Sequence, residues 1–192
     1  NLGNALRKGM NPVGAEAAFV QALKCNNSLF GAAVGLGQSL SEQGKFPQAA
    51  EVFKQIIAQK KDDPDLYSHL GNALRMQGLR DEAMQVYQMM LNLRPNDPKI
   101  IHQYGLVMMD VGRLEEAFNQ FKYALSLKQD YPEAHNSMSI VLQMLKQDDN
   151  ALAHNLEAVK LNPNFTEAWN NLGNLYGLGG KPKEAIDAFR KS

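Results

Sequence analysis

A repeating unit of 34 residues runs through the whole chain without insertion or deletion. A dipeptide that is usually Leu-Gly recurs once in every unit, and an alanine returns with the same period. The dipeptide stands at Leu2-Gly3, Leu36-Gly37, Leu70-Gly71, Tyr104-Gly105, Met138-Ser139 and Leu172-Gly173, and the alanines are Ala15, Ala49, Ala83, Ala117, Ala151 and Ala185. A fixed period of this length predicts a stack of identical supersecondary units, each packed against its neighbours.

Residues 64–97 show what one unit contains. Apolar residues follow one another at steps of three and four, as on one face of a helix. The first such stripe consists of Tyr67, Leu70, Gly71 and Leu74, and the second of Ala83, Tyr87, Met90 and Leu91. The unit is therefore predicted to be two antiparallel helices. The small residues of the two stripes allow a close approach of the helix backbones.

Prolines and glycines mark where these helices begin and end. Pro64, Pro98 and Pro132 lie one period apart at the start of a first helix, where a missing backbone donor costs least. The joint between the helices carries a residue suited to the left-handed conformation: Gly44, Gly78, Gly112 and Gly180. Met10 stands at this position in the first copy, so we expect that joint to be built differently. Acidic residues such as Glu115 and Glu116 follow, at the start of the second helix.

The pattern resembles the tetratricopeptide repeat (TPR) family, most fully in the last copy. There Trp169, Leu172, Gly173, Tyr176, Ala185 and Phe189 have the family's spacing. The segment around them is similar to repeats of bacterial TPR proteins and of O-GlcNAc transferase arms. The resemblance implies an all-α fold, a right-handed superhelix of antiparallel helix pairs, as a single array over residues 1–192. Its copies would be 1–29 (partial), 30–63, 64–97, 98–131, 132–165 and 166–192 (partial).

Composition narrows the range of functions. Twenty basic and twenty acidic residues cancel, so no net field attracts nucleic acid or an anionic membrane. No apolar run approaches the roughly 18 residues of a membrane-spanning helix. Cys25 is the one cysteine, so an internal disulfide is excluded. The chain starts within a first helix and stops within a second, so we expect a longer parent chain, and the compartment is undetermined.

No catalytic or cofactor site is predicted. His69, His102 and His135 fall on successive first helices, and we expect them to face solvent or line a groove. Metal ligands must converge to about 2 Å from one ion, whereas the axes of packed helices stand about 8–10 Å apart. We therefore expect no metal, no cofactor and no enzymatic activity of the segment itself.

Copy 5 departs most from the pattern. Ser139 replaces the glycine of the first helix, Lys146 the turn glycine and Asn155 the aromatic residue of the second helix. A buried asparagine needs hydrogen-bond partners or costs roughly 1–3 kcal/mol. Copy 5 is thus predicted to be the weakest part of the array, unless Leu156 or another neighbour repacks into that place.

In TPR arrays a second stripe on the first helices lines a concave groove, where peptides usually lie. Here we predict a peptide-binding groove across copies 3 to 5. Its candidate residues are Asn72, Met76, His102, Gln103, Leu106, Met109, Asn136, Ile140 and Met144. Exposed apolar clusters mark partner sites, and methionine adapts to varied partners. The alternative is that Met76, Met109 and Met144 belong to the core. The basic residues Arg75 and Lys99 beside the groove balance the acidic residues Asp110 and Glu133. We therefore expect salt to affect the affinity for the peptide only mildly.

Two binding modes of the family match only in part. The clamp of chaperone adaptors for a C-terminal carboxylate keeps Asn72, but Glu133 would repel the carboxylate. The asparagine ladder of O-GlcNAc transferases keeps Asn1 and Asn171, while Gly35, His69, Gln103 and Ser137 interrupt it.

The sequence therefore predicts a scaffold that binds a protein or a peptide in its groove. Two alternatives stay open. One is a substrate-recruiting arm of a larger glycosyltransferase-like or sulfotransferase-like enzyme. The other is a scaffold that self-associates through its open ends.

Overall fold

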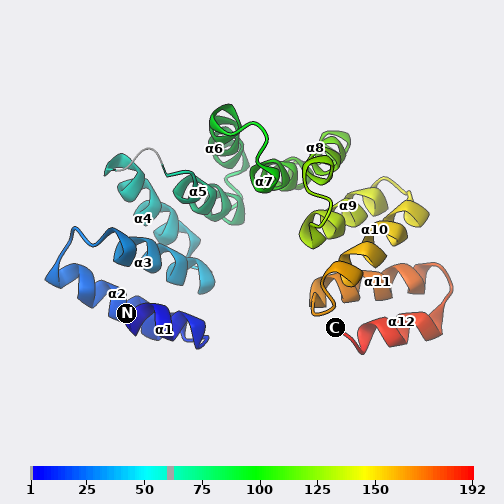
Figure 1. Ribbon diagram of the computed structural model, residues 1–192, viewed down its shortest axis with the longest axis horizontal. Coiled ribbons are helices and arrows are strands. Elements are labelled where there is room, and N and C mark those ends of the chain that lie inside the picture. Colours follow the sequence, from blue (N-terminus) through cyan, green and yellow to red (C-terminus); the bar gives the residue numbers. More distant parts are fainter. Residues whose placement is uncertain (1, 60–62) are drawn as a thin grey trace. The chain divides into compact units, whose positions relative to one another are not determined.

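The computed structural model describes residues 2–59 and 63–192, which form helices joined by short turns (Figure 1). Two helices fall within each predicted copy, so the all-α repeat class and the helix–turn–helix unit are confirmed. The helices are α1 (Leu2–Lys8), α2 (Pro12–Cys25), α3 (Phe30–Glu42), α4 (Phe46–Gln59), α5 (Pro64–Met76), α6 (Arg80–Leu93), α7 (Pro98–Asp110), α8 (Leu114–Leu127), α9 (Pro132–Met144), α10 (Asp148–Leu161), α11 (Thr166–Leu178) and α12 (Pro182–Phe189).

The ends of α7 show why the helices begin and stop where they do. Pro98 occupies the first turn, and the carboxylate of Asp97 accepts hydrogen bonds from the backbone amides of Lys99 and Ile100 at 2.9 and 3.4 Å. Such a cap satisfies donors that the first helical turn leaves free. Beyond the helix, Gly112 adopts a φ of 78°. The amide of Arg113 then bonds back to the carbonyl of Met108 at 2.9 Å, so the chain reverses at the predicted glycine.

The prediction that the first joint is built differently is wrong. Met10 has a φ of 56° and Lys146 a φ of 61°, so both non-glycine residues adopt the conformation of the turn glycines. The amide of Asn11 bonds to the carbonyl of Leu6 at 2.9 Å, which repeats the closure seen in the regular copies. Packing of the two helices therefore imposes the turn, although the left-handed region costs a residue with a Cβ roughly 1–2 kcal/mol.

Each regular copy is held together by a glycine that faces an aromatic ring. A Cβ added at Gly105 would lie 2.6 Å from the ring of Phe121, and one added at Gly71 would lie 2.7 Å from the ring of Tyr87. Both rings are fully buried. The same relation holds for Gly3 with Phe19, Gly37 with Phe53 and Gly173 with Phe189. The glycine is thus required by steric contact, because any side chain there would displace the ring.

The helices gather into two compact units, and the boundary between them falls in the sequence between Leu93 and Arg94. In the first unit α3 contacts both α1 and α5, while α2 and α4 each pack against the first helix of their own copy and of the next copy. In the second unit α7 contacts α9, and α8 and α10 pack in the same alternating way. First helices therefore form one layer and second helices another within each unit. The prediction of one continuous array over 1–192 stays a prediction.

Candidate interaction surface

The nine residues predicted to form the groove are divided between the two units. Asn72 and Met76 lie on α5 of the first unit, and both are exposed. The other seven lie on α7 and α9 of the second unit: His102, Gln103, Leu106, Met109, Asn136, Ile140 and Met144. The candidate surface is therefore built here from the first-helix layer of the second unit, to which α11 also belongs.

Contrary to the expectation from the sequence, the side chain of His102 does not face solvent. Only 4% of its surface is exposed. Its Nε2 lies 2.9 Å from the hydroxyl of Ser137, and its Nδ1 lies 3.3 Å from the hydroxyl of Tyr131. Burial raises the pKa of Tyr131 to about 12, so this hydroxyl stays protonated and can donate to the imidazole. The ring also lies 5.5 Å from the ring of Phe121. His102 thus joins α7 to α9 from behind the surface.

Asn136 is also buried, at 8% exposure. Its side-chain oxygen accepts a hydrogen bond of 2.9 Å from the amide nitrogen of Asn171 on α11. This pair links two neighbouring first helices, so Asn171, one of the two residues that match the asparagine ladder, is engaged within the protein. Asn1, the other member of that ladder, lies outside the described residues.

Four apolar residues of the predicted groove lie on the neighbouring helices α7 and α9, and together we call them the apolar strip: Leu106, Met109, Ile140 and Met144. Leu106 and Met109 are half-buried and pack against the core cluster around Met108 and Phe121. Ile140 is half-buried, and Met144 is 50% exposed. The methionines were predicted either to form a partner surface or to belong to the core, and each hypothesis holds in part. Met109 packs against the core, whereas Met144 and, in the first unit, Met76 lie on the surface.

Gln103 adds an unsatisfied acceptor beside this strip. Its side-chain oxygen is buried, and among the residues that the structure describes it has no hydrogen-bond partner. The residue as a whole is partly exposed. An unpaired buried acceptor costs about 1–3 kcal/mol, so a donor supplied from outside would recover part of that free energy.

The charges on the first helices of the second unit are not balanced. Lys99 is the one lysine or arginine on α7, α9 and α11, whereas Asp110, Glu133 and Glu167 are acidic. The balance expected from the sequence relied on Arg75, which belongs to the first unit. Within the second unit this layer carries an excess of negative charge.

Copy 5 contains a contact between two histidines that the sequence did not predict. The Nδ1 atoms of His135 on α9 and His154 on α10 lie 3.0 Å apart, and Nε2 of His135 lies 3.1 Å from the carbonyl of Gln129. A carbonyl only accepts, so Nε2 of His135 carries the proton and Nδ1 accepts from Nδ1–H of His154. Burial lowers the pKa of both imidazoles, and the charge of His135 lowers the pKa of His154 further. The spacing of these two residues carries no motif, so only the packing of two helices reveals the pair.

Neither a metal cluster nor a membrane-spanning helix occurs among the residues that the structure describes. No three histidine, cysteine or carboxylate side chains of segments 2–59 and 63–192 come together as a metal site. No described helix has the length and apolar content that crossing a bilayer requires.

The fold and the repeat units agree with known proteins. Models of the tetratricopeptide repeat match residues 40–102 and 154–187. The chain belongs to the tetratricopeptide repeat family. No curated protein sequence matches it significantly.

Several solved structures share the fold. TTC0263, a thermophilic TPR protein of Thermus thermophilus, has a TM-score of 0.78 and 23% identity over 91% of this chain and 95% of its own. A chain of the APC/C hetero-tetramer Cut9–Hcn1 has a TM-score of 0.84 and 18% identity over 99% of this chain and 38% of its own. A structure of MamA has a TM-score of 0.63 and 19% identity over 81% of this chain and 91% of its own. At these identities the likeness concerns the fold.

Proposed function

We propose that this chain is a protein-interaction scaffold that binds an extended peptide on the first-helix layer of its second unit. Membership of the tetratricopeptide repeat family supports a scaffold role in general. The particular surface rests on one observation. Exposed Met144 and half-buried Ile140 lie on α9, which contacts α7, and α7 carries Gln103, whose buried oxygen lacks a partner among the described residues.

These features suit the two parts of a peptide. Apolar side chains of the peptide would cover Ile140 and Met144, and full burial of one such side chain is worth about 1.5–3 kcal/mol. The buried oxygen of Gln103 would become accessible by rotation of this partly exposed side chain, and a backbone amide of the peptide would then supply the donor that it lacks. Two or three anchored side chains would give affinity on the order of micromolar after the entropy losses of binding.

The charges predict what else the peptide contains. Glu133 and Glu167 outnumber Lys99 on this layer, so a basic residue beside the apolar anchors is favoured and an acidic one is disfavoured. Affinity should therefore fall as salt is raised, because exposed charges are screened beyond about 10 Å at 0.1 M.

The experiment starts from a displayed random peptide library selected on the whole chain. The best peptide is then titrated into the chain and its variants by calorimetry. Ile140→Glu and Met144→Glu are expected to weaken binding at least about tenfold, which corresponds to roughly 1.4 kcal/mol. The matched control is Leu127→Glu, because Leu127 is a comparably exposed apolar residue (42%) at the end of α8, a second helix. Circular dichroism confirms that each variant is folded. Equal binding by all three variants would place the site elsewhere.

A further inference from the structure

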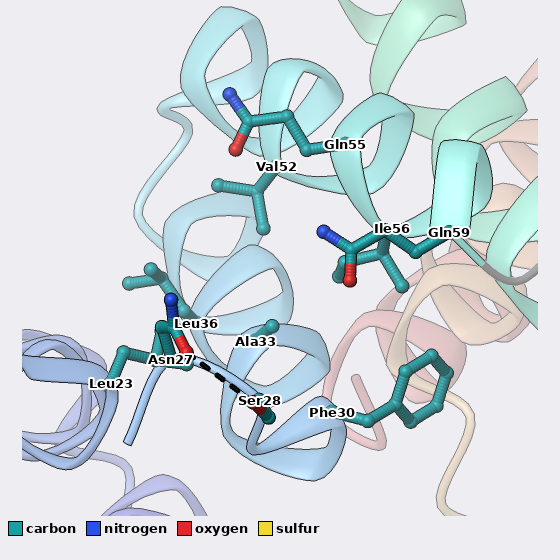
Figure 2. A pocket seen from close by; sticks show the side chains of 10 residues that line it. All are labelled: Leu23, Asn27, Ser28, Phe30, Ala33, Leu36, Val52, Gln55, Ile56 and Gln59. Carbon is teal, nitrogen blue, oxygen red and sulfur yellow. Dashed lines mark hydrogen bonds between the residues drawn. The ribbon is translucent and has the colours of Figure 1, made fainter. Parts of the chain in front are cut away.

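A separate pocket lies in the first unit, where copy 1 meets copy 2 (Figure 2). It has a volume of about 250 Å³. Its apolar walls come from Leu23 at the end of α2, Ala33 and Leu36 on α3, and Val52 and Ile56 on α4. Polar groups stand around these walls: Asn27, Ser28, Gln55 and Gln59. Apolar walls with a few polar groups are typical of a ligand site.

One wall of the pocket is lined by an unusually small residue, Ala33. Ala33 stands where the later copies have larger side chains, namely Tyr67, Ile101, His135 and Trp169. The methyl group of Ala33 leaves open the volume that those side chains occupy. In Figure 2 Ala33 lies below the space that Val52 and Ile56 bound from above.

The last copy shows which group fits such walls. There Trp169 packs against a cluster that includes Val159, Leu172 and Ala188. Each of these three stands four repeat lengths after a wall residue of the pocket, in the order Leu23, Leu36 and Val52. In copy 6 an indole ring of the protein itself therefore packs against the equivalent walls, and Trp169 lines a further pocket of about 280 Å³ with Leu172, Ala188 and Lys191.

The polar partners of Trp169 also have equivalents at the pocket. The indole Nε1–H donates to the carbonyl of Pro163 at 2.8 Å, and the ammonium of Lys191 lies 4.6 Å from the ring centroid. Four repeat lengths earlier stand Asn27, with its own backbone carbonyl, and Gln55, and both line the pocket. An indole ring that enters the pocket would therefore meet the backbone carbonyl of Asn27, which is the equivalent of the Pro163 carbonyl that accepts from the N–H of Trp169.

We propose that this pocket binds a tryptophan side chain presented by a partner polypeptide. A cavity of about 150 Å³ holds one benzene ring, so a pocket of about 250 Å³ has room for the two fused rings of an indole. The polar groups around the opening suit the peptide backbone on either side of the tryptophan. The site lies on α2, α3 and α4 and is independent of the surface on α7 and α9.

The test uses the whole chain and a capped pentapeptide, Gly-Gly-Trp-Gly-Gly, labelled with fluorine on the indole and observed by ¹⁹F NMR. Binding of one side chain is expected in the millimolar range, a dissociation constant of roughly 1 mM. Ala33→Trp and Ala33→Ile fill the pocket and should weaken binding at least about tenfold. Ile101 already occupies the same position in copy 4, where it is buried, so the isoleucine variant should fold. The control Ala17→Trp adds an indole at an exposed site of α2 and should bind as the parent does.

Three outcomes would overturn the proposal. The first is no binding by the parent chain at about 5 mM peptide, several times the expected dissociation constant. The second is undiminished binding by Ala33→Ile or Ala33→Trp. The third is binding of free fluoroindole without binding of the pentapeptide, which would show a site for a small aromatic molecule. A matched peptide with leucine in place of tryptophan should bind more weakly, since it lacks the indole ring and its N–H donor.

Discussion

The side-chain nitrogen of Asn155 donates a hydrogen bond of 3.3 Å to the hydroxyl of Ser139. Both residues are buried, at 0% and 1% exposure. Asn155 occupies the position of the aromatic ring and Ser139 the position of the glycine in the regular copies. In copy 5 a polar pair therefore replaces the steric contact between the first and the second helix of the copy. The alternative that Leu156 repacks into this place is wrong, because Leu156 is 41% exposed. The oxygen of Asn155 has no partner among the described residues, which keeps copy 5 the predicted weak point.

This relation predicts strong coupling between the two positions. Asn155→Phe alone should destabilise the chain by about 1–3 kcal/mol, because the Cβ of Ser139 would meet the ring. Ser139→Gly alone removes the remaining partner of Asn155 and should also destabilise it. The double variant restores the pair seen as Gly105 and Phe121, so it should be more stable than either single variant. Urea unfolding of all four proteins measures this coupling, and additive effects would show that the two residues act separately.

Lys146 offers a test of the strained turn. Its φ of 61° lies in the left-handed region, so Lys146→Gly should stabilise the chain by about 1 kcal/mol. The reverse change Gly112→Lys, at the equivalent turn of copy 4, should destabilise it by a similar amount. Thermal melts followed by circular dichroism give both values. A melting temperature that falls for Lys146→Gly would mean that the lysine side chain contributes more than the strain costs.

His135 and His154 should make stability depend on pH. Burial holds the pKa of each below the ordinary value of 6.5 in the folded chain. The unfolded chain therefore takes up protons first, and the contribution to stability is present above about pH 6.5 and lost as the pH falls toward the folded pKa values. Glu157 acts in the opposite sense on His135. Burial also lowers the pKa of His69 in the first unit, so His69 adds to the same trend.

The measurement compares melting temperatures at about pH 7.5 and about pH 5.5, on either side of the ordinary histidine pKa. The parent should lose stability at the lower pH, and His154→Gln should lose less, since one titrating group and its repulsion of His135 are gone. Identical losses in parent and variant would assign the pH dependence to other groups.

His102 should matter for stability and not for ligand contact. His102→Ala leaves the hydroxyls of Ser137 and Tyr131 without this partner, so unfolding should become easier by about 1–3 kcal/mol. The affinity for the peptide selected on the whole chain should change less than about twofold, below roughly 0.4 kcal/mol. A large loss of affinity with little loss of stability would return His102 to the binding surface.

Much of the fold follows from the 34-residue period. The starts of the helices at Pro98 and Pro132, and the reversal at Gly112, depend on local backbone preferences that the sequence displays directly. The candidate surface could be predicted only in part. Spacing placed Ile140, Met144 and His102 on one stripe, but it could not show that His102 turns inward to meet Ser137.

The sequence by itself thus determined the repeat, the family, the helix pairs and the conformation of four turns. Tertiary structure decided which polar side chains are buried, that Met10 and Lys146 adopt the glycine turn, and that Ala33 lines a pocket. The physical reason is that periodicity fixes positions within one copy. The environment of a side chain depends on the size and hydrogen-bonding capacity of residues on neighbouring helices, as Ser139 and Asn155 show.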